Sequence, residues 1–301
     1  MSRIFDALQR FEQEKRAGQA TNPAAAPDTP AAAVASAAPA YAASATLTQT
    51  VAEPDWNPKP LNIAPEESSR LVAISDPFSI GAENFRMLGS RLAQMKTAGR
   101  NRILITSSVA DEGKTVIATN LAATLAKRSG ERVLLIEGDL RAPKVLDDLG
   151  AGQAAGISEW YRLGGSIFDY IYRVQSLELN VLPAGLGVDD PLELLDSQAF
   201  SRTMTLLAQH FDWIVVDSSP LVPVADSLCW MRNIDSVLLV TRENKTPKNL
   251  LAKAVKTIDQ SKIIGVVLND ASRAKSASKY YGYYKYGNRG NAASKSPEVT
   301  N

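Results

Sequence analysis

Two groups of residues in this sequence point to phosphate chemistry. The first is the tripeptide Gly113-Lys114-Thr115, the ending of a loop that binds nucleotide phosphates, although Ser108 stands where such a loop normally has its first glycine. In these loops backbone N–H groups face the phosphates, the lysine reaches the β and γ oxygens, and the Thr hydroxyl ligates Mg²⁺. We therefore predict that ATP and Mg²⁺ bind here. The predicted nucleotide contacts are Glu112, Gly113, Lys114, Thr115 and Val116.

The second group is a cluster of tyrosines near the C-terminus. Five of the nine tyrosines lie within seven residues: Tyr280, Tyr281, Tyr283, Tyr284 and Tyr286. The segment has neither the period of a strand nor that of a helix, which is typical of an exposed tail. Next to a phosphate-binding domain, these tyrosines are candidate phosphate acceptors of an enzyme that phosphorylates itself. The alternative is a low-complexity tail without chemistry.

Acidic residues stand directly after two apolar segments, one on each side of the middle of the chain. Residues 133–136 lead into Glu137 and Asp139, and residues 213–216 lead into Asp217. The carboxyl ends of parallel strands meet at one edge of a sheet, so these carboxylates are expected beside Lys114. Carboxylates there need a cation, which Mg²⁺ with ATP supplies. The side chains of the acidic loop residues, Asp111 and Glu112, are expected to point away from the phosphates.

The elements that position these residues follow from alternating apolar runs and helical stretches. Short runs without polar alternation predict strands that are buried on both faces, and helices are expected at residues 78–96, 114 to about 129, and 191–210. Gly130 is expected to end the second of these helices. The predicted strands are residues 102–106, 133–136, 180–182, 213–216, 236–240 and 263–268. This order predicts an α/β fold: a P-loop NTPase with a doubly wound, mostly parallel sheet and helices on both faces.

Composition divides the chain and excludes some functions. A formal net charge of +1 gives no electrostatic case for nucleic acid, and the single cysteine, Cys229, permits neither an internal disulfide nor a cysteine metal cluster. No apolar stretch is long enough to span a bilayer and no secretory signal is present, so a cytoplasmic protein is expected. The expected parts are an amphipathic helix at 1–18, an Ala/Pro-rich disordered linker at 19–64, the nucleotide-binding domain at 65–271, and a flexible basic tail at 272–301.

Both ends of the chain carry features that suggest docking. Ile4, Phe5, Leu8 and Phe11 share one helical face, and a helix this short needs a partner, a membrane surface or its own domain to lie on. Residues 272–289 contain basic residues but no acidic ones, so an acidic pocket is expected to attract them. Each phosphate adds nearly two negative charges, so phosphorylation is expected to loosen the docked tail.

Together these features resemble the bacterial tyrosine kinases (BY-kinases) of capsule and exopolysaccharide synthesis. The resemblance covers about residues 70–286. It is carried by the loop at 106–115, the stretch at 133–143 with its D-L-R-x-P ending, the strand and acidic end at 213–220, and the tyrosine cluster. The combination is specific, because related P-loop ATPases lack both the D-L-R-x-P ending and the cluster.

The resemblance implies ATP-dependent phosphorylation of tyrosine, chiefly on the tails of neighbouring subunits. It implies that Lys114 contacts the phosphates and that Thr115, Asp139 and Asp217 hold Mg²⁺, directly or through water. A carboxylate at position 137 would help to deprotonate the tyrosine, and Asn269 would lie on the adenine side. The implied catalytic residues are Lys114, Glu137, Asp139 and Asp217.

The resemblance also implies partners. These are a transmembrane regulator of polysaccharide chain length, expected as a separate polypeptide, further copies of the chain in a homo-oligomer, and a cognate tyrosine phosphatase. The kinase would then lie at the inner face of the plasma membrane through its partner, without nucleic acid.

The sequence departs from the family pattern at three places. Glu137 replaces the usual aspartate, which puts the alignment of proton transfer in doubt, and Asp111 replaces a glycine where positive φ is common. On the first helix of the domain the family carries E-x-x-R-x-x-R, which is associated with ring-like assembly. Glu83 and Arg86 match, but Gly89 replaces the second arginine.

Two other functions fit part of the pattern. A ParA-like partitioning or cell-division ATPase shares the fold, but such enzymes carry an extra lysine early in the loop, which residues 108–110 lack, and they have no tyrosine cluster. A regulatory P-loop ATPase that acts by nucleotide-dependent assembly, without kinase activity, is the second; the change at Glu137 keeps it open.

Overall fold

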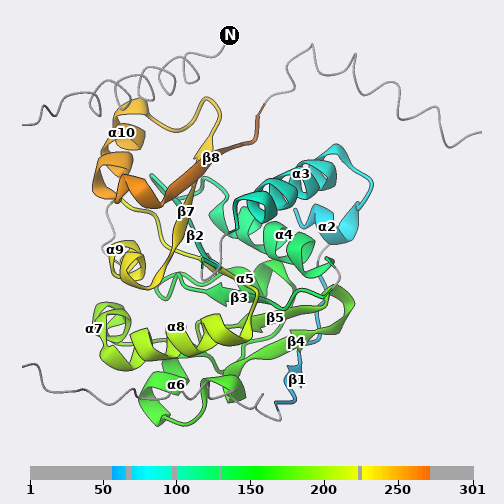
Figure 1. Ribbon diagram of the computed structural model, residues 1–301, viewed down its shortest axis with the longest axis vertical. Coiled ribbons are helices and arrows are strands. Elements are labelled where there is room, and N and C mark those ends of the chain that lie inside the picture. The colour runs from blue at the N-terminus through cyan, green and yellow to red at the C-terminus, as the bar shows by residue number, and fades with distance from the viewer. Residues whose placement is uncertain (1–55, 66–69, 97–99, 129, 223–225, 272–301) are drawn as a thin grey trace, which may run out of the picture. The chain divides into compact units, whose positions relative to one another are not determined.

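The computed structural model describes residues 56–65, 70–96, 100–128, 130–222 and 226–271 (Figure 1). The amphipathic helix expected at 1–18, the linker as far as residue 55 and the tyrosine cluster lie outside the described residues. The domain expected at 65–271 is described except at its short gaps.

One sheet of eight strands organises the domain. Its spatial order is β1-β4-β5-β3-β6-β2-β7-β8, and every neighbouring pair is parallel except β4 with β5, which is antiparallel. The mostly parallel sheet predicted from the sequence is thus confirmed. The strands are β1 (Lys59–Pro60), β2 (Arg102–Ser107), β3 (Val133–Glu137), β4 (Tyr172–Val174), β5 (Leu179–Leu182), β6 (Trp213–Asp217), β7 (Ser236–Arg242) and β8 (Ile263–Asn269).

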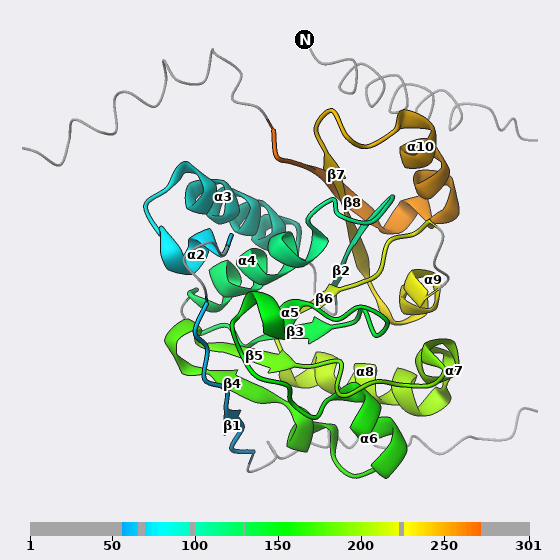
Figure 2. The same cartoon turned by 180° about the vertical axis from the view of Figure 1, so that it is seen from behind.

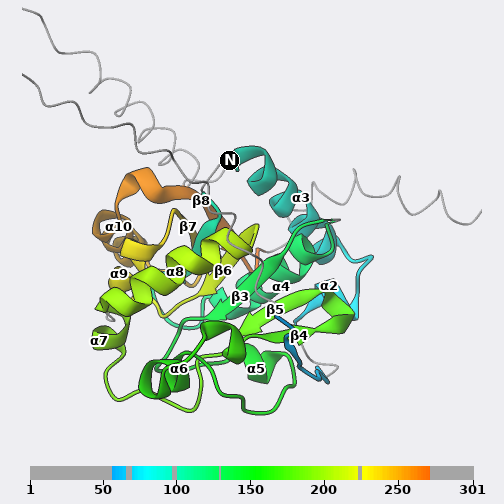
Figure 3. The same cartoon turned by 60° about the horizontal axis from the view of Figure 1, so that its bottom comes forward.

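Helices cover both faces of this sheet, and each face has its own apolar core (Figures 1 and 2). One core joins the sheet to α2 (Val72–Ser75), α3 (Ile80–Met95), α4 (Lys114–Ala126) and α5 (Val145–Asp148). The other joins it to α6 (Ile157–Leu163), α7 (Pro191–Asp196), α8 (Gln198–His210), α9 (Asp226–Trp230) and α10 (Lys248–Thr257). Figure 3 shows α8 lying along its face of the sheet. Four short 3₁₀ turns complete the described elements: Ile167–Tyr170, Gln175–Leu177, Met231–Asn233 and Gln260–Lys262.

The helix that follows the phosphate-binding loop, α4, is buried almost all the way round. Ala118, Leu121 and Leu125 are fully inaccessible, and small residues let α3 pack closely against it. Its Asn120 accepts a hydrogen bond from the N–H of Ala73 and donates one to the carbonyl of Arg70. Because a helix that is apolar on every side must be enclosed, the sequence itself places α4 between the sheet and a second helical layer.

The folded domain begins earlier than expected. Residues 56–64, assigned to the disordered linker, lie against the sheet: β1 pairs with β4, and the indole N–H of Trp56 donates to the carbonyl of Phe168 at 2.9 Å. The Trp56 ring also contacts Phe168 and Phe211, with ring centroids 5.3 and 5.8 Å away. One large aromatic side chain that buries its ring and pairs its N–H is enough to order a short segment that lacks a repeating apolar pattern.

Two helix predictions need correction. The single helix expected over 191–210 is two, because Ser197 ends α7 and its hydroxyl then accepts the N–H of Phe200 as the N-cap of α8. The helix after the loop ends at Ala126 with Lys127 as its C-cap, so Gly130, with φ of +78°, belongs to the following turn. Local capping decides both boundaries.

A charged anchor joins the starts of β2 and β7. Asp235 accepts hydrogen bonds from the N–H groups of Asn101 and Arg102, and pairs with the Arg102 guanidinium at 2.6 Å. Burial by itself would raise the pKa of Asp235, but these hydrogen bonds outweigh burial and the pKa lies below its ordinary value. The ionised carboxylate is therefore stabilised by folding.

We predict that Asp235→Asn lowers the free energy of unfolding by about 2 kcal/mol at neutral pH, since a partly buried guanidinium loses its charged partner. A carboxylate whose pKa is depressed in the folded state stabilises the protein above its unfolded pKa of about 3.9 and loses this effect as the pH falls through the folded value. The gap between wild type and variant should accordingly shrink below about pH 4. Urea unfolding followed by circular dichroism measures both effects.

Asp196→Asn is the control, because Asp196 pairs with Arg232 in an exposed ion pair. Such pairs contribute about 0–1 kcal/mol. Equal losses in the two variants, or a gap for Asp235→Asn that does not change with pH, would contradict the prediction.

Candidate active site

The predicted site residues meet at the carboxyl ends of the central strands. β6 lies between β3 and β2; Asp217 at its end is the register partner of Glu137 on one side and of Ile105 on the other. The loop after β2 leads directly into α4, which begins at Lys114. The structure thus brings Lys114, Thr115, Glu137 and Asp217 to one edge of the sheet, as parallel strands require.

The loop itself holds two residues in the left-handed region. Asp111 has φ of +60° and Gly113 has φ of +89°. Aspartate tolerates this conformation better than most residues, which explains how it stands at a position where the family has glycine. Gly113 is constrained further, because a Cβ there would lie 2.1 Å from Nδ2 of Asn269.

The acidic side chain of Glu112 is enclosed by the protein. It is 2% exposed, and its Oε2 accepts hydrogen bonds from the N–H groups of Ser108 and Val109 at 2.8 and 3.2 Å. A buried carboxylate is tolerable when N–H donors satisfy it. Glu112 therefore fixes the start of the loop, while its own carbonyl accepts the side-chain amide of Asn269 at 2.9 Å.

Asp217 is the most unusual carboxylate of the site. Its Oδ2 accepts the Thr115 hydroxyl at 2.8 Å, whereas Oδ1 is buried and has no hydrogen-bond partner among the described residues. Burial raises the pKa of Asp217 to about 7, although the Thr115 hydroxyl and the charge of Lys114 oppose the shift. A buried oxygen without a donor is costly unless a ligand uses it.

These donors fit a magnesium ion. The unpartnered Asp217 oxygen, the Thr115 hydroxyl and the half-buried carboxylate of Asp139 are hard oxygen ligands of the kind that Mg²⁺ prefers. In the part of the chain that the structure describes, no three acidic, histidine or cysteine side chains form a complete metal site. That also suits Mg²⁺, which usually takes one or two carboxylates and fills its other positions with water and phosphate oxygens.

Asp139 lies two residues beyond β3, and Gly138 makes this position possible. A Cβ at Gly138 would come within 2.8 Å of the Asp217 carbonyl, the Trp230 ring and Val216, so no larger residue fits there. Burial raises the pKa of Asp139, while the charge of Lys114 lowers it. Its Oδ1 accepts the N–H of Ala142 at 3.3 Å.

Glu137, the implied base, is engaged elsewhere. Its Oε1 accepts the N–H of Val145 at 2.6 Å and its Oε2 accepts that of Ala184 at 3.1 Å. Burial raises the pKa of Glu137, and these backbone hydrogen bonds lower it. In this conformation the carboxylate joins the start of α5 to the segment after β5.

Other residues of the site were missed from the sequence. Arg141, two positions after Asp139, donates to both oxygens of the buried Asp226, at 2.7 and 3.1 Å. Ser227 donates to the carbonyl of Ser219, so the segment after β6 is also tied to α9. The only signal was the arginine of the D-L-R-x-P ending; nothing local marks Asp226 as its partner. Asn269 was expected on the adenine side, and the structure places its amide against the loop backbone.

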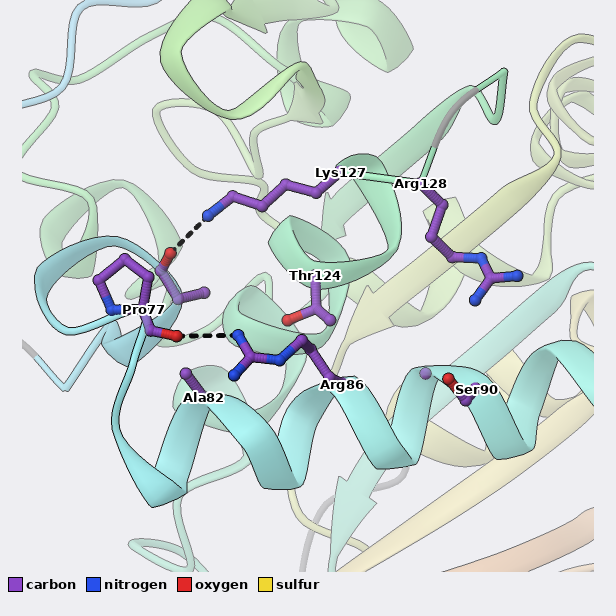
Figure 4. A pocket seen from close by; sticks show the side chains of 9 residues that line it. Pro77, Ala82, Arg86, Ser90, Thr124, Lys127 and Arg128 are labelled. Carbon is purple, nitrogen blue, oxygen red and sulfur yellow. Dashed lines mark hydrogen bonds between the residues drawn. The ribbon is translucent and has the colours of Figure 1, made fainter. Parts of the chain in front are cut away.

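The helix with the partial E-x-x-R-x-x-R pattern borders a cavity of about 260 Å³, away from the strand ends (Figure 4). Figure 4 shows the two cations of this cavity: Arg86 donates to the carbonyl of Pro77, between α2 and α3, and Lys127 donates to the carbonyl of Ala73, in α2. Arg86 also pairs with Glu83 at 2.5 Å. Gly89 lies beside this cavity. The two residues that match the pattern, Glu83 and Arg86, thus make contacts within the domain.

The geometry above is that of a P-loop nucleotide-binding protein, and residues 103–292 match the family described as the CobQ/CobB/MinD/ParA nucleotide binding domain. The chain belongs to this family. Within it, the chain belongs to the bacterial tyrosine kinases of capsule and exopolysaccharide synthesis, as its relatives show.

Three relatives illustrate this membership. The putative tyrosine-protein kinase CapB of Staphylococcus aureus is 31% identical over 71% of this chain and 95% of its own length. The tyrosine-protein kinase Wzc of Salmonella typhi is 27% identical over 73% of this chain, but the chain spans only 31% of Wzc. The kinase domain of the Escherichia coli tyrosine kinase ETK superposes with a TM-score of 0.62 at 26% identity, covering 68% of this chain and 82% of that domain.

None of the helices in the described ranges combines the length and the apolar character that crossing a bilayer would require.

We predict that Asp217→Asn leaves the melting temperature of the nucleotide-free protein intact but abolishes its increase by Mg²⁺-ATP. A carboxyl group whose folded pKa is raised binds more protons in the folded than in the unfolded state, so stability falls as the pH rises from about 4 to 7. The variant lacks this cost and should melt no lower than wild type at pH 8 without nucleotide. It should also lose the stabilisation by Mg²⁺-ATP, because the cation loses a negative ligand. Differential scanning fluorimetry at pH 6 and 8, with and without Mg²⁺-ATP, checks both statements.

A variant that melts well below wild type at pH 8, or that still gains stability from Mg²⁺-ATP, would show that Asp217 has a structural role instead.

Proposed function

We propose that this protein is an ATP-dependent protein-tyrosine kinase that phosphorylates the cluster from Tyr280 to Tyr286 on neighbouring copies of itself. Through this it would regulate the polymerisation and export of exopolysaccharide or capsule. The observation that carries the proposal is the unsatisfied Asp217 oxygen beside Thr115, in a chain that carries a tyrosine cluster at residues 280–286.

The proposed reaction needs positioning and charge neutralisation. The tyrosine oxygen attacks the γ-phosphorus, the bond from that phosphorus to the bridging oxygen breaks, and ADP leaves. Loop N–H groups and Lys114 orient the phosphates, and the copy that binds ATP forms no covalent bond to them. Mg²⁺, held by Thr115, Asp217 and Asp139, would neutralise the developing charge on the phosphate oxygens.

A base is useful because the tyrosine hydroxyl has a pKa near 10. Glu137 is the proposed base: each of its oxygens accepts one backbone N–H, from Val145 or Ala184, and keeps a second lone pair that can take a proton. Its raised pKa favours proton uptake. Asp139, which has a raised pKa and is less completely buried, is the alternative base.

The partners are proposals that rest on family membership. We infer that a transmembrane regulator of polysaccharide chain length activates the kinase and holds it at the inner face of the membrane. Copies of the chain would form a homo-oligomer in which each tail reaches a neighbour, and a cognate phosphatase would reverse the modification.

The test is phosphate mapping by mass spectrometry after incubation with ATP, Mg²⁺ and the cytoplasmic segment of the transmembrane regulator. Wild type should carry phosphotyrosine within residues 280–286, and Lys114→Ala should lose at least about 99% of it, since a phosphate contact of the transition state is removed. Mixing Lys114→Ala with a copy whose five tail tyrosines are phenylalanine should restore phosphate on the Lys114→Ala tail, because transfer occurs between copies.

Arg91→Gln is the control for the removal of a positive charge elsewhere in the domain, since Arg91 is exposed on α3 away from the strand ends, and it should leave phosphorylation unchanged. ATP turnover or nucleotide-dependent assembly without phosphotyrosine would favour the regulatory ATPase. Comparison of Glu137→Gln with Asp139→Asn identifies the base: the variant that lacks it should lose the pH dependence of transfer.

A further inference from the structure

We propose that Thr246, acting through the carboxylate of Glu112, is a positioning residue for the phosphate-binding loop. Its hydroxyl holds Glu112 in the orientation that fixes the loop for ATP. Thr246 lies on the turn after β7, more than a hundred residues beyond the loop, and no sequence motif connects the two.

The carboxylate of Glu112 has two ends with different partners. Oε2 accepts hydrogen bonds from the N–H groups of Ser108 and Val109, inside the loop. Oε1 accepts a hydrogen bond from the hydroxyl of Thr246, which lies outside the loop. Because Glu112 is 2% exposed, water cannot replace a lost donor without opening the loop.

The Thr246 hydroxyl is itself held in place. It accepts the N–H of Arg242 at 2.8 Å. Its one hydrogen faces two acceptors, Oε1 of Glu112 and the carbonyl of Arg242 at 3.2 Å, and the charged carboxylate is the stronger of the two. A second hydrogen bond holds the same turn, because the N–H of Thr246 donates to the carbonyl of Arg242 at 3.2 Å. Asn244 at the turn has φ of +58°, a conformation that asparagine adopts more readily than most residues. The hydroxyl therefore acts from a rigid support.

The same turn touches the loop a second time. Nη1 of Arg242 donates to the carbonyl of Asp111 at 3.2 Å, and the N–H of Glu243 donates to the carbonyl of Asn269, whose amide holds the carbonyl of Glu112. Contacts from the ends of β7 and β8 thus converge on residues 111–112. The N–H groups that face a nucleotide belong to the residues that follow, so their direction depends on this support.

The role assigned to Thr246 is binding rather than chemistry. Its hydroxyl reaches Glu112 and not the carboxylates at the ends of β3 and β6. Removing it should therefore raise the Kd and the KM for ATP more than it lowers kcat. Since a direct binding measurement does not need kinase activity, this proposal can fail or succeed independently of the proposed function.

The test compares Thr246→Val, which keeps the shape and loses the hydroxyl, with Thr246→Ser, which keeps the hydroxyl. Binding of a fluorescent ATP analogue with Mg²⁺ should weaken about tenfold in Thr246→Val, a factor that corresponds to about 1.4 kcal/mol, and stay near the wild-type value in Thr246→Ser. Thr257→Val is the control, because the Thr257 hydroxyl only donates to the carbonyl of Lys253 on α10. If Thr246→Val fails to fold, Thr246→Ala removes the hydroxyl without a branched side chain.

Binding by Thr246→Val within twofold of wild type would overturn the proposal, as would equal weakening in Thr246→Ser. A fall in kcat with unchanged Kd and KM would also overturn it, because it would place Thr246 in the chemical step.

Discussion

A buried carboxylate with one oxygen left unsatisfied is the constraint around which the nucleotide edge is built. Asp217 ends the strand between β2 and β3, so its position is fixed by two neighbouring strands and cannot relax toward water. Thr115, in the first turn of α4, satisfies one oxygen, and only a ligand can satisfy the other. The missing side chain at Gly138 lets the chain that leaves β3 lie directly against the Asp217 carbonyl at the end of β6.

The acidic loop residues show how such a site tolerates negative charge beside a triphosphate. Glu112 faces N–H donors and a hydroxyl, so its charge is satisfied inside the protein and does not confront the nucleotide. Asp111 contributes a left-handed backbone and a carbonyl that Arg242 holds. The loop is thereby stiffened before ligand arrives, which reduces the entropy that binding must overcome.

Much of this arrangement follows from the sequence. Continuous apolar runs predicted the central strands, and their parallel order brought Asp217 and Glu137 to the side of Lys114. Features that depend on contacts between distant residues were not predictable: the aromatic anchor of Trp56, the partner of Arg141, and the support of Glu112 by Thr246 have no local pattern. The antiparallel pair β4–β5 was missed for a related reason, since β4 has three residues and too little periodicity to recognise.

The chain enters the sheet at one edge and leaves it at the other. β1 follows the segment anchored by Trp56 at one edge, and β8 leads into the C-terminal residues at the other, so seven strand spacings, about 33 Å, separate the incoming from the outgoing chain. A molecule that bound along the β1 edge would therefore leave the β8 edge uncovered.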